Sequence, residues 1–309
     1  MSYIRFKSKI IEQKVKHYLK KKHAHLLVKE GRRVLVKEEG AEFVTKMLIE
    51  NDDLVSEDLA ELEMFPNIKQ LELYSGGITH LEALPPLDKL EKLNFGVDVR
   101  DYSPLAKYKK LKNVEIYNSE VQDISALCEL PKIKILSLSS NKISSIKGIE
   151  KLQNLTELTL DRNNITDISP LAALHKLTYL QLENNRISDL SALKNMKNLT
   201  SLRLSDNKIT NLAPLRELCL ETLELDSNAI EDLSDLVGIK TLNRLYICFN
   251  PIKDASPLLK MPHLKRIWTD ATDIFLPLEA YFEKNITNVV LGGVYPNFIE
   301  AQTYSFGRE

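Results

Sequence analysis

The sequence has few cysteines, few glycines and a single tryptophan among its 309 residues. The cysteines, Cys128, Cys219 and Cys248, are too few and too scattered for a disulfide framework, which favours a reducing compartment and predicts a cytoplasmic protein. No apolar run approaches the ~20 residues of a membrane-spanning helix. The basic N-terminal segment also lacks the apolar stretch of a secretory signal. We therefore expect a protein that neither crosses a membrane nor enters the secretory route.

Sequence signatures of catalysis and of metal binding are missing as well. The chain contains no phosphate-binding GxxxxGK[ST] loop, no GxGxxG, no HExxH and no CxxC pair. Only His23 and His25 lie close together, and a solvated pair is favoured over a metal site there. We therefore predict that the protein is not an enzyme and that it uses neither a cofactor nor a metal.

A repeat of 22 residues dominates what is present. Strand-like Leu-x-Leu pairs begin at Leu136, Leu158, Leu180, Leu202, Leu223 and Leu245, with steps of 22, 22, 22, 21 and 22 residues. The same frame continues in weaker form through Met47, Leu71, Leu93, Val114, Ile267 and Val289. It predicts about twelve repeats of one short structural unit.

The spacing has a physical cause. In each Leu-x-Leu segment the side chains alternate, so the leucines face one way and their neighbours face the other. A lone strand of this kind buries nothing, but stacked strands form a parallel sheet with a continuous leucine core. An asparagine occupies the turn after the strand, where its amide is expected to bond with backbone groups that have left the ladder. These asparagines are Asn141, Asn163, Asn185, Asn207, Asn228 and Asn250.

The second half of each repeat carries Asp-Ile-Ser or Asp-Leu-Ser, as in Asp167-Ile168-Ser169. Such residues favour the start of a helical turn. A unit of 22 residues leaves room only for a 3₁₀ or single-turn helix on the side away from the strand. The pattern thus predicts a curved parallel sheet on a concave face and short turns on a convex face.

The motif with its Asn-x-Ile-x-Asp-Ile-Ser-Pro-Leu ending resembles the 22-residue leucine-rich repeats of bacterial internalins. It is also similar to regulatory subunits of protein phosphatase 1 built from such repeats. The resemblance covers residues 44–291 and implies an α/β leucine-rich-repeat solenoid. It further implies a protein partner bound on the concave strands, without naming that partner. Internalins are exported, and we find neither a signal sequence nor a C-terminal anchoring motif in the sequence. Its last residues, 292–309, also lack the terminal cap sequence expected of the phosphatase regulators.

Charge is distributed unevenly near the N-terminus. Residues 1–37 contain twelve Lys and Arg against Glu12 and Glu30, a net charge of +10, whereas residues 38–64 carry −9. The basic segment predicts an amphipathic helix with Ile11, Val15 and Tyr18 on one face, followed by a hairpin around Gly31. We favour a cap that closes the solenoid over an arm for nucleic acid or anionic lipid, because interleaved aromatic residues are lacking.

The predicted domains are a basic N-terminal helix-plus-hairpin cap at 1–43, the solenoid of about twelve repeats at 44–291, and a C-terminal cap or tail at 292–309. In each repeat the residues that flank the strand leucines should face solvent on the concave side. They give an acidic central strip and an aromatic-basic anchor near the C-terminal end. The predicted partner-binding residues are Tyr74, Tyr117, Glu157, Asp161, Tyr179, Glu183, Glu224, Asp226, Arg244, Tyr246, Arg266 and Trp268.

Two competing interpretations of these residues stay open. Strand positions favour Tyr, Trp and Thr for their β propensity alone, and the C-terminal cap could cover Trp268. For function, the sequence predicts a monomeric, non-enzymatic scaffold or regulator that binds a protein partner, rather than nucleic acid or a membrane. The alternatives are a secreted or host-directed effector of the internalin-like kind, and a nucleic-acid or membrane adaptor that uses the basic N-terminal arm.

Overall fold

The computed structural model describes residues 2–97, 99–261, 263–270 and 288–291. The chain divides into two compact units, which we call unit 1 (Met1–Ile143) and unit 2 (Ser144–Glu309). The predicted C-terminal cap at 292–309 lies outside the described residues. Within the described part, no helix is both long enough and apolar enough to cross a membrane.

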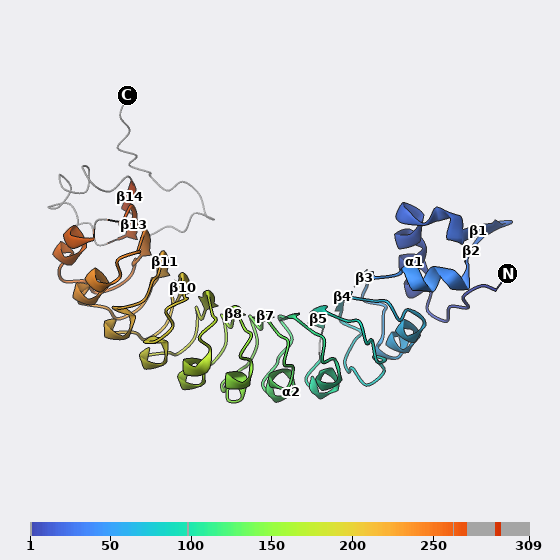
Figure 1. The fold of residues 1–309 in the computed structure, drawn as a ribbon, viewed down its shortest axis with the longest axis horizontal. Coiled ribbons are helices and arrows are strands. Elements are labelled where there is room, and N and C mark those ends of the chain that lie inside the picture. Colours follow the sequence, from blue (N-terminus) through green and yellow to red (C-terminus); the bar gives the residue numbers. More distant parts are fainter. Residues whose placement is uncertain (1, 98, 262, 271–287, 292–309) are drawn as a thin grey trace, which may run out of the picture. The chain divides into compact units, whose positions relative to one another are not determined.

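Unit 1 opens with a helix and a hairpin and then continues as stacked repeats (Figure 1). Its elements are α1 (Lys9–Lys22), η1 (Ala24–Leu26), β1 (Leu27–Glu30), β2 (Arg33–Val36), η2 (Glu38–Phe43), β3 (Lys46–Glu50), η3 (Ser56–Met64), β4 (Gln70–Ser75), β5 (Lys92–Val97), η4 (Ser103–Lys107), β6 (Asn113–Ile116), α2 (Ser125–Cys128) and β7 (Ile135–Ser137).

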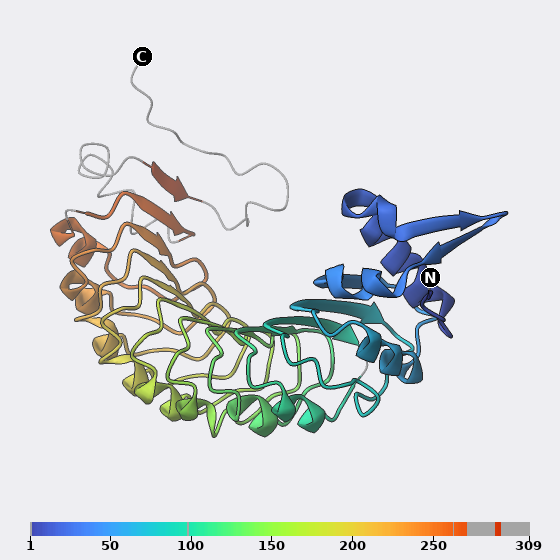
Figure 2. The same ribbon diagram turned by 45° about the vertical axis from the view of Figure 1, so that its right-hand side comes forward.

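Helix α1 packs on the first strand of the unit 1 sheet, as expected for a cap. Its residues Ile11, Val15 and Leu19 are fully buried, and α1 contacts β3. Leu19 completes the buried face in place of the expected Tyr18, which stays half-buried and hydrogen bonds through its hydroxyl to Thr45 Oγ1 at 3.0 Å. The antiparallel hairpin β1–β2 follows, with Gly31 in the turn at φ +61°, a conformation that glycine adopts without strain (Figure 2).

In its described residues, unit 2 is built of repeats in which short strands alternate with 3₁₀ turns (Figure 1). Its elements are η5 (Ile149–Lys151), β8 (Glu157–Thr159), η6 (Ser169–Ala173), β9 (Tyr179–Gln181), η7 (Ser191–Leu193), β10 (Ser201–Arg203), η8 (Ala213–Leu215), β11 (Thr222–Glu224), η9 (Ser234–Gly238), β12 (Arg244–Tyr246), η10 (Ser256–Lys260), β13 (Arg266–Thr269) and β14 (Asn288–Leu291).

The strand register confirms the repeat frame that the sequence predicts. In unit 1 the parallel partners are Met47, Leu71, Leu93, Val114 and Leu136, in that order. In unit 2 they are Leu158, Leu180, Leu202, Leu223, Leu245, Ile267 and Val289. The strand leucines of the central repeats are fully buried, whereas their neighbours in sequence face the opposite side of the sheet. The fold is therefore a leucine-rich-repeat solenoid, with strands on the concave side and 3₁₀ turns on the convex side of the repeats.

The turn asparagines tie each repeat to the one before it, and we call them the ladder asparagines. Asn185 Nδ2 donates to the carbonyl oxygens of Leu182 and Glu183 in its own repeat and of Leu160 in the preceding repeat, at 3.0–3.1 Å. The backbone amide of Ile165 donates to Asn185 Oδ1 at 3.0 Å. Asn207, Asn228 and Asn250 bond in the same pattern. The expected structural role of these amides is thereby confirmed.

The residue before each ladder asparagine adopts a left-handed backbone conformation, with φ between 52° and 57°. These residues are Ser140, Arg162, Asn184, Asp206, Ser227 and Phe249. For a residue other than glycine this conformation costs roughly 1–2 kcal/mol. The hydrogen bonds of the adjoining asparagine offset that cost, because they need the sharp turn that this conformation produces.

In several repeats an aspartate stands two residues before the serine that opens the convex turn. Asp167 Oδ1 accepts the backbone amide of Ser169 at 2.8 Å, and the Ser169 hydroxyl donates to Asp167 Oδ2 at 3.0 Å. The corresponding bonds recur at Asp123, Asp232 and Asp254. The Asp-x-Ser spacing therefore closes a local turn in which the carboxylate is the acceptor.

Asn185→Ala should lower the free energy of unfolding by about 1–3 kcal/mol, because buried backbone groups of two repeats lose their partner. Chemical denaturation measures the change. Asn198→Ala is the matched control, since Asn198 is exposed and makes a single bond to the His175 carbonyl at 2.8 Å; it should cost less than about 1 kcal/mol. Equal losses in the two variants would contradict the structural role of the ladder.

Candidate protein-binding face

Residues in and directly after strands β8–β13 form three parallel rows on the concave side of unit 2. The first row contains Glu157, Tyr179, Ser201, Thr222, Arg244 and Arg266. The second contains Thr159, Gln181, Arg203, Glu224, Tyr246 and Trp268. The third row follows where the backbone ladder continues past the strands, and contains Asp161, Glu183, Ser205, Asp226, Cys248 and Asp270.

Tyr246 and Trp268 stack face to face in the second row, and we call them the stacked pair. They are register partners on neighbouring strands, with ring centroids 3.9 Å apart and planes inclined by 3°. Both side chains are half-buried, so each ring keeps an open part toward solvent. Trp268 therefore lies on the concave face, and the stack holds two flat apolar surfaces in fixed positions.

Two arginines lie beside the stacked pair in the first row. Arg244 and Arg266 are exposed register partners, and Arg244 Nε donates to Thr222 Oγ1 at 3.1 Å. Like charges directly opposite each other on neighbouring strands are destabilising. A partner that supplied negative charge here would relieve this repulsion.

Three carboxyl groups lie close together in the second and third rows. They belong to Glu183, Glu224 and Asp226, which we call the acidic cluster. Burial, followed by the neighbouring Glu224, raises the pKa of Glu183 to about 7. Burial likewise raises the pKa of Asp226 to about 6, against the backbone amide of Cys248, which donates to Asp226 Oδ1 at 2.7 Å. Burial also raises the pKa of Glu224, although Arg203 Nε lies 3.4 Å from Glu224 Oε1. These carboxyl groups thus hold protons more tightly than free carboxyl groups do.

The thiol of Cys248 lies next to this cluster but is unsuited to nucleophilic chemistry. It is only 8% exposed, and burial raises the pKa of Cys248 to about 12. A nucleophilic cysteine needs the thiolate, which a lowered pKa supplies. The side chain of Cys248 therefore stays a neutral thiol, buried at the concave face.

Unit 1 carries a second aromatic pair on its own concave face. Tyr74 belongs to β4 and Tyr117 directly follows β6, and their ring centroids lie 6.1 Å apart across Gly96 of β5. A Cβ atom at Gly96 would lie 2.9 Å from Tyr74 Cδ1. Glycine at this position therefore lets the two rings approach each other.

The predicted partner-binding residues all lie on the sheet faces, and the structure gathers most of those in unit 2 around the stacked pair. Glu157 is exposed at one end of the first row, while Asp161 and Tyr179 are half-buried. Asp226 differs from the solvent-facing position expected for it, since it is 5% exposed beneath its neighbours. The other two predicted residues, Tyr74 and Tyr117, belong to unit 1.

The predicted set omits three residues that the structure places within or beside this face. Arg203 lies in the second row beside Tyr179 and Glu224, with its guanidinium carbon 6.0 Å from the Tyr179 ring centroid. Gln181 links Tyr179 and Glu183, because it accepts from the phenol and donates to the carboxylate, each at 2.8 Å. Phe249 is 50% exposed. The sequence feature that could have identified Phe249 is its position as an aromatic residue directly before the ladder asparagine Asn250.

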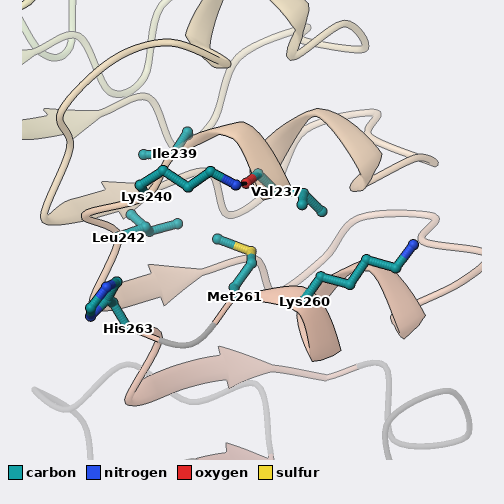
Figure 3. Close-up of a pocket in the computed structure, with 7 residues that line it drawn as sticks. All are labelled: Val237, Ile239, Lys240, Leu242, Lys260, Met261 and His263. Atoms are coloured by element: carbon teal, nitrogen blue, oxygen red, sulfur yellow. Dashed lines mark hydrogen bonds between the residues drawn. The ribbon is translucent and has the colours of Figure 1, made fainter.

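A small cavity on the convex side makes a poor alternative site. It lies between the turns η9 and η10 and is lined mainly by Val237, Ile239, Leu242 and Met261, with an accessible volume of about 10 Å³ (Figure 3). Lys240 donates to the Val237 carbonyl at 2.9 Å rather than into the cavity. The space suits one water molecule at most.

Comparisons with known proteins agree with the repeat architecture. A family model described as leucine-rich repeat matches residues 153–209, and a model for two copies of such repeats matches residues 131–173. A search of curated proteins finds no match.

Several solved structures resemble the chain. An internalin (inlF) from Listeria monocytogenes is 26% identical with a TM-score of 0.75, over 93% of this chain and 90% of that one. A leucine-rich-repeat protein from Leptospira interrogans is 21% identical with a TM-score of 0.68, over 80% and 73% of the two chains. A plant peptide hormone receptor (RGFR1), solved in complex with RGF2, is 17% identical with a TM-score of 0.54, over 68% and 41% of the two chains. The chain is thus a leucine-rich-repeat protein that resembles internalins.

Glu183→Gln should stabilise the protein at pH 8 and have little effect near pH 5. A raised carboxyl pKa contributes stability that is present below the ordinary value of 4.5 and lost as the pH rises through about 7. The variant should therefore gain about 1–2 kcal/mol at pH 8, after a discount for the partial exposure of Glu183. Denaturant titrations at both pH values measure the difference.

Glu217→Gln is the matched control for this experiment. Glu217 is an exposed carboxylate of the same unit, and a hydrogen bond from Lys197 lowers its pKa. A lowered pKa contributes stability above 4.5, so this variant should gain nothing at pH 8. A pH-independent change in Glu183→Gln would contradict the crowding of the acidic cluster.

Proposed function

We propose that this leucine-rich-repeat protein, which resembles internalins, is a non-enzymatic scaffold or regulator that binds a protein partner on the concave face of unit 2. Binding of proteins is typical of leucine-rich-repeat domains. The protein would act as a monomer in a reducing compartment, where the exposed thiol of Cys219 stays reduced. The cytoplasm is such a compartment.

The stacked pair is the observation that carries this proposal. Trp, Tyr and Arg dominate the energy of protein interfaces, and here Tyr246 and Trp268 stack beside Arg244 and Arg266. Strand propensity accounts for aromatic residues on a sheet, but it does not require two rings in parallel contact next to two exposed guanidinium groups. An interface anchor accounts for both features.

Rigidity of the face supports the same function. The backbone beneath the rows is fixed on one side by the strand ladder and on the other by the ladder asparagines. A partner therefore meets side chains that are already positioned, which lowers the entropy lost on binding. Because the rings of Tyr246 and Trp268 are already stacked and half-buried, their side chains lose little conformational entropy when a partner binds.

Binding fits the chemistry of this face better than catalysis does. The polar residues recur once per strand, as the repeat requires, and the raised pKa of Cys248 disfavours a thiolate nucleophile. The basic N-terminal helix has a structural role, because its apolar face is buried on unit 1. Capping accounts for that segment without a nucleic-acid or membrane ligand.

Site-specific cross-linking tests where the partner binds. A photoreactive amino acid in place of Glu157, at the exposed end of the first row, should capture one defined protein in the cells that make this chain. The same group in place of Lys194, which is exposed and follows the convex turn η7, is the control. Capture only from the Lys194 position would contradict a concave binding site.

With the captured partner in purified form, Tyr246→Ala combined with Trp268→Ala should weaken binding by at least ~2 kcal/mol, about 30-fold in Kd. The emission of Trp268 in the wild-type protein should shift to the blue on binding, because the indole loses its remaining contact with water. Phe43→Ala is the control, since Phe43 is an exposed aromatic residue of unit 1, 41% exposed, outside the strands. Undiminished affinity in the double variant would overturn this anchor.

A further inference from the structure

The acidic cluster contains more negative charge than its surroundings balance. Glu183, Glu224 and Asp226 come from three neighbouring repeats, with Arg203 and Ser205 of the middle strand between them. Arg203 Nε lies 3.4 Å from Glu224 Oε1 and makes the closest ion pair of the cluster. One positive guanidinium group therefore lies among three carboxyl groups.

The carboxyl groups already interact with one another in the free protein. Glu224 is among the neighbours that raise the pKa of Glu183, and Asp226 in turn is among those that raise the pKa of Glu224. Each ionised carboxylate therefore opposes the ionisation of the next. The free protein accordingly binds a proton at this cluster more tightly than at an isolated carboxylate.

Buried polar groups without partners point into the same cluster. Ser205 is 1% exposed, and its hydroxyl makes no hydrogen bond. It lies in the third row between Glu183 and Asp226. Arg203 Nε is likewise buried without a hydrogen bond. An unpartnered buried hydroxyl costs free energy, which a ligand with hydrogen-bonding groups would recover.

The other charges that face the cluster do not neutralise it. Asp161 follows β8, Asp206 follows β10 and Asp270 follows β13, and all three carboxyl groups act on the cluster. Arg244 of β12 acts on Glu224. Cys248, which follows β12, is neutral and donates its backbone amide to Asp226. The carboxyl groups in and around the cluster therefore outnumber the arginines Arg203 and Arg244 that face it.

We propose that the acidic cluster receives a lysine or arginine side chain of the protein partner. The inference rests on the proposed function and names the chemistry of the partner: a basic segment that lies along the third row. The ammonium or guanidinium group forms charge-assisted hydrogen bonds with Glu183 and Glu224. Its aliphatic stem lies toward the stacked pair, whose rings offer apolar surface beside Glu224.

Proton release is the measurable consequence. The proton leaves the carboxyl group for solvent as the cation binds, so affinity rises with pH. A carboxyl group that titrates near pH 7 is ionised to about a tenth at pH 6 and to about nine tenths at pH 8. The lysine side chain stays charged at both values. Affinity for a lysine peptide should therefore be roughly tenfold higher at pH 8 than at pH 6.

The test uses the full chain and a hexalysine amide as the probe, with Kd measured by calorimetry at pH 6 and pH 8. Wild-type protein should show the roughly tenfold difference. Glu183→Gln with Asp226→Asn should bind more weakly and show nearly equal affinities at both pH values. The charge-matched control is Glu217→Gln with Glu231→Gln, at exposed carboxylates that pair with Lys197 and Lys253. It should keep the wild-type pH dependence.

Each outcome decides the inference. Absence of hexalysine binding by the wild-type protein overturns it, as does a double variant that behaves like its control. Loss of the pH dependence in the double variant alone supports it. The captured partner separates this inference from the proposed function. Suppose that Tyr246→Ala with Trp268→Ala abolishes partner binding, while Glu183→Gln with Asp226→Asn leaves it unchanged. The concave binding face is then supported, and the basic segment of the partner is rejected.

Discussion

The bonds between each ladder asparagine and the backbone of two successive repeats are the interaction on which the rest of the structure depends. A strand of three residues has too few ladder bonds to fix its own position, and a 3₁₀ turn adds few. Asn185 adds donors and an acceptor at the point where the chain leaves the strand, and spans from its own repeat to Leu160 and Ile165 of the one before. The leucine core then stacks in register because each turn is locked to its neighbour. The left-handed residues before the asparagines are the conformational cost of that lock.

The chemistry of the concave face follows from this register. Once neighbouring strands are aligned residue by residue, side chains one repeat apart must lie side by side. That alignment brings Tyr246 onto Trp268 and places Arg244 opposite Arg266. It also crowds Glu183, Glu224 and Asp226 around a single guanidinium group. The position of these side chains in rows is therefore a product of the fold, although their residue types are free to vary with the partner.

Sequence periodicity predicts the fold well, and it predicts the site only in part. The register from Met47 to Val289, the ladder asparagines and the outward side of Tyr246 and Trp268 all follow from period-two and 22-residue spacing. The burial of Asp226 does not, because it depends on the size of side chains one repeat away. Neither Arg162 nor Phe249 has a side chain that favours a left-handed backbone, and only the ladder asparagine that follows each of them signals this conformation. Leu19 rather than Tyr18 closes the buried face of α1 because the phenol reaches Thr45 instead.

Amide hydrogen exchange at Ile165, Ile187, Ile209 and Ile230 tests the central role of the ladder most directly. The backbone amide of each of these residues donates to the side-chain oxygen of the ladder asparagine of the next repeat, at 2.9–3.1 Å. If that bond holds the repeats together, these four amides should exchange only when the repeats open together, as slowly as the amides of the strand leucines. Exchange at the rate of a solvent-exposed turn amide, while the strand leucines stay protected, would contradict the account.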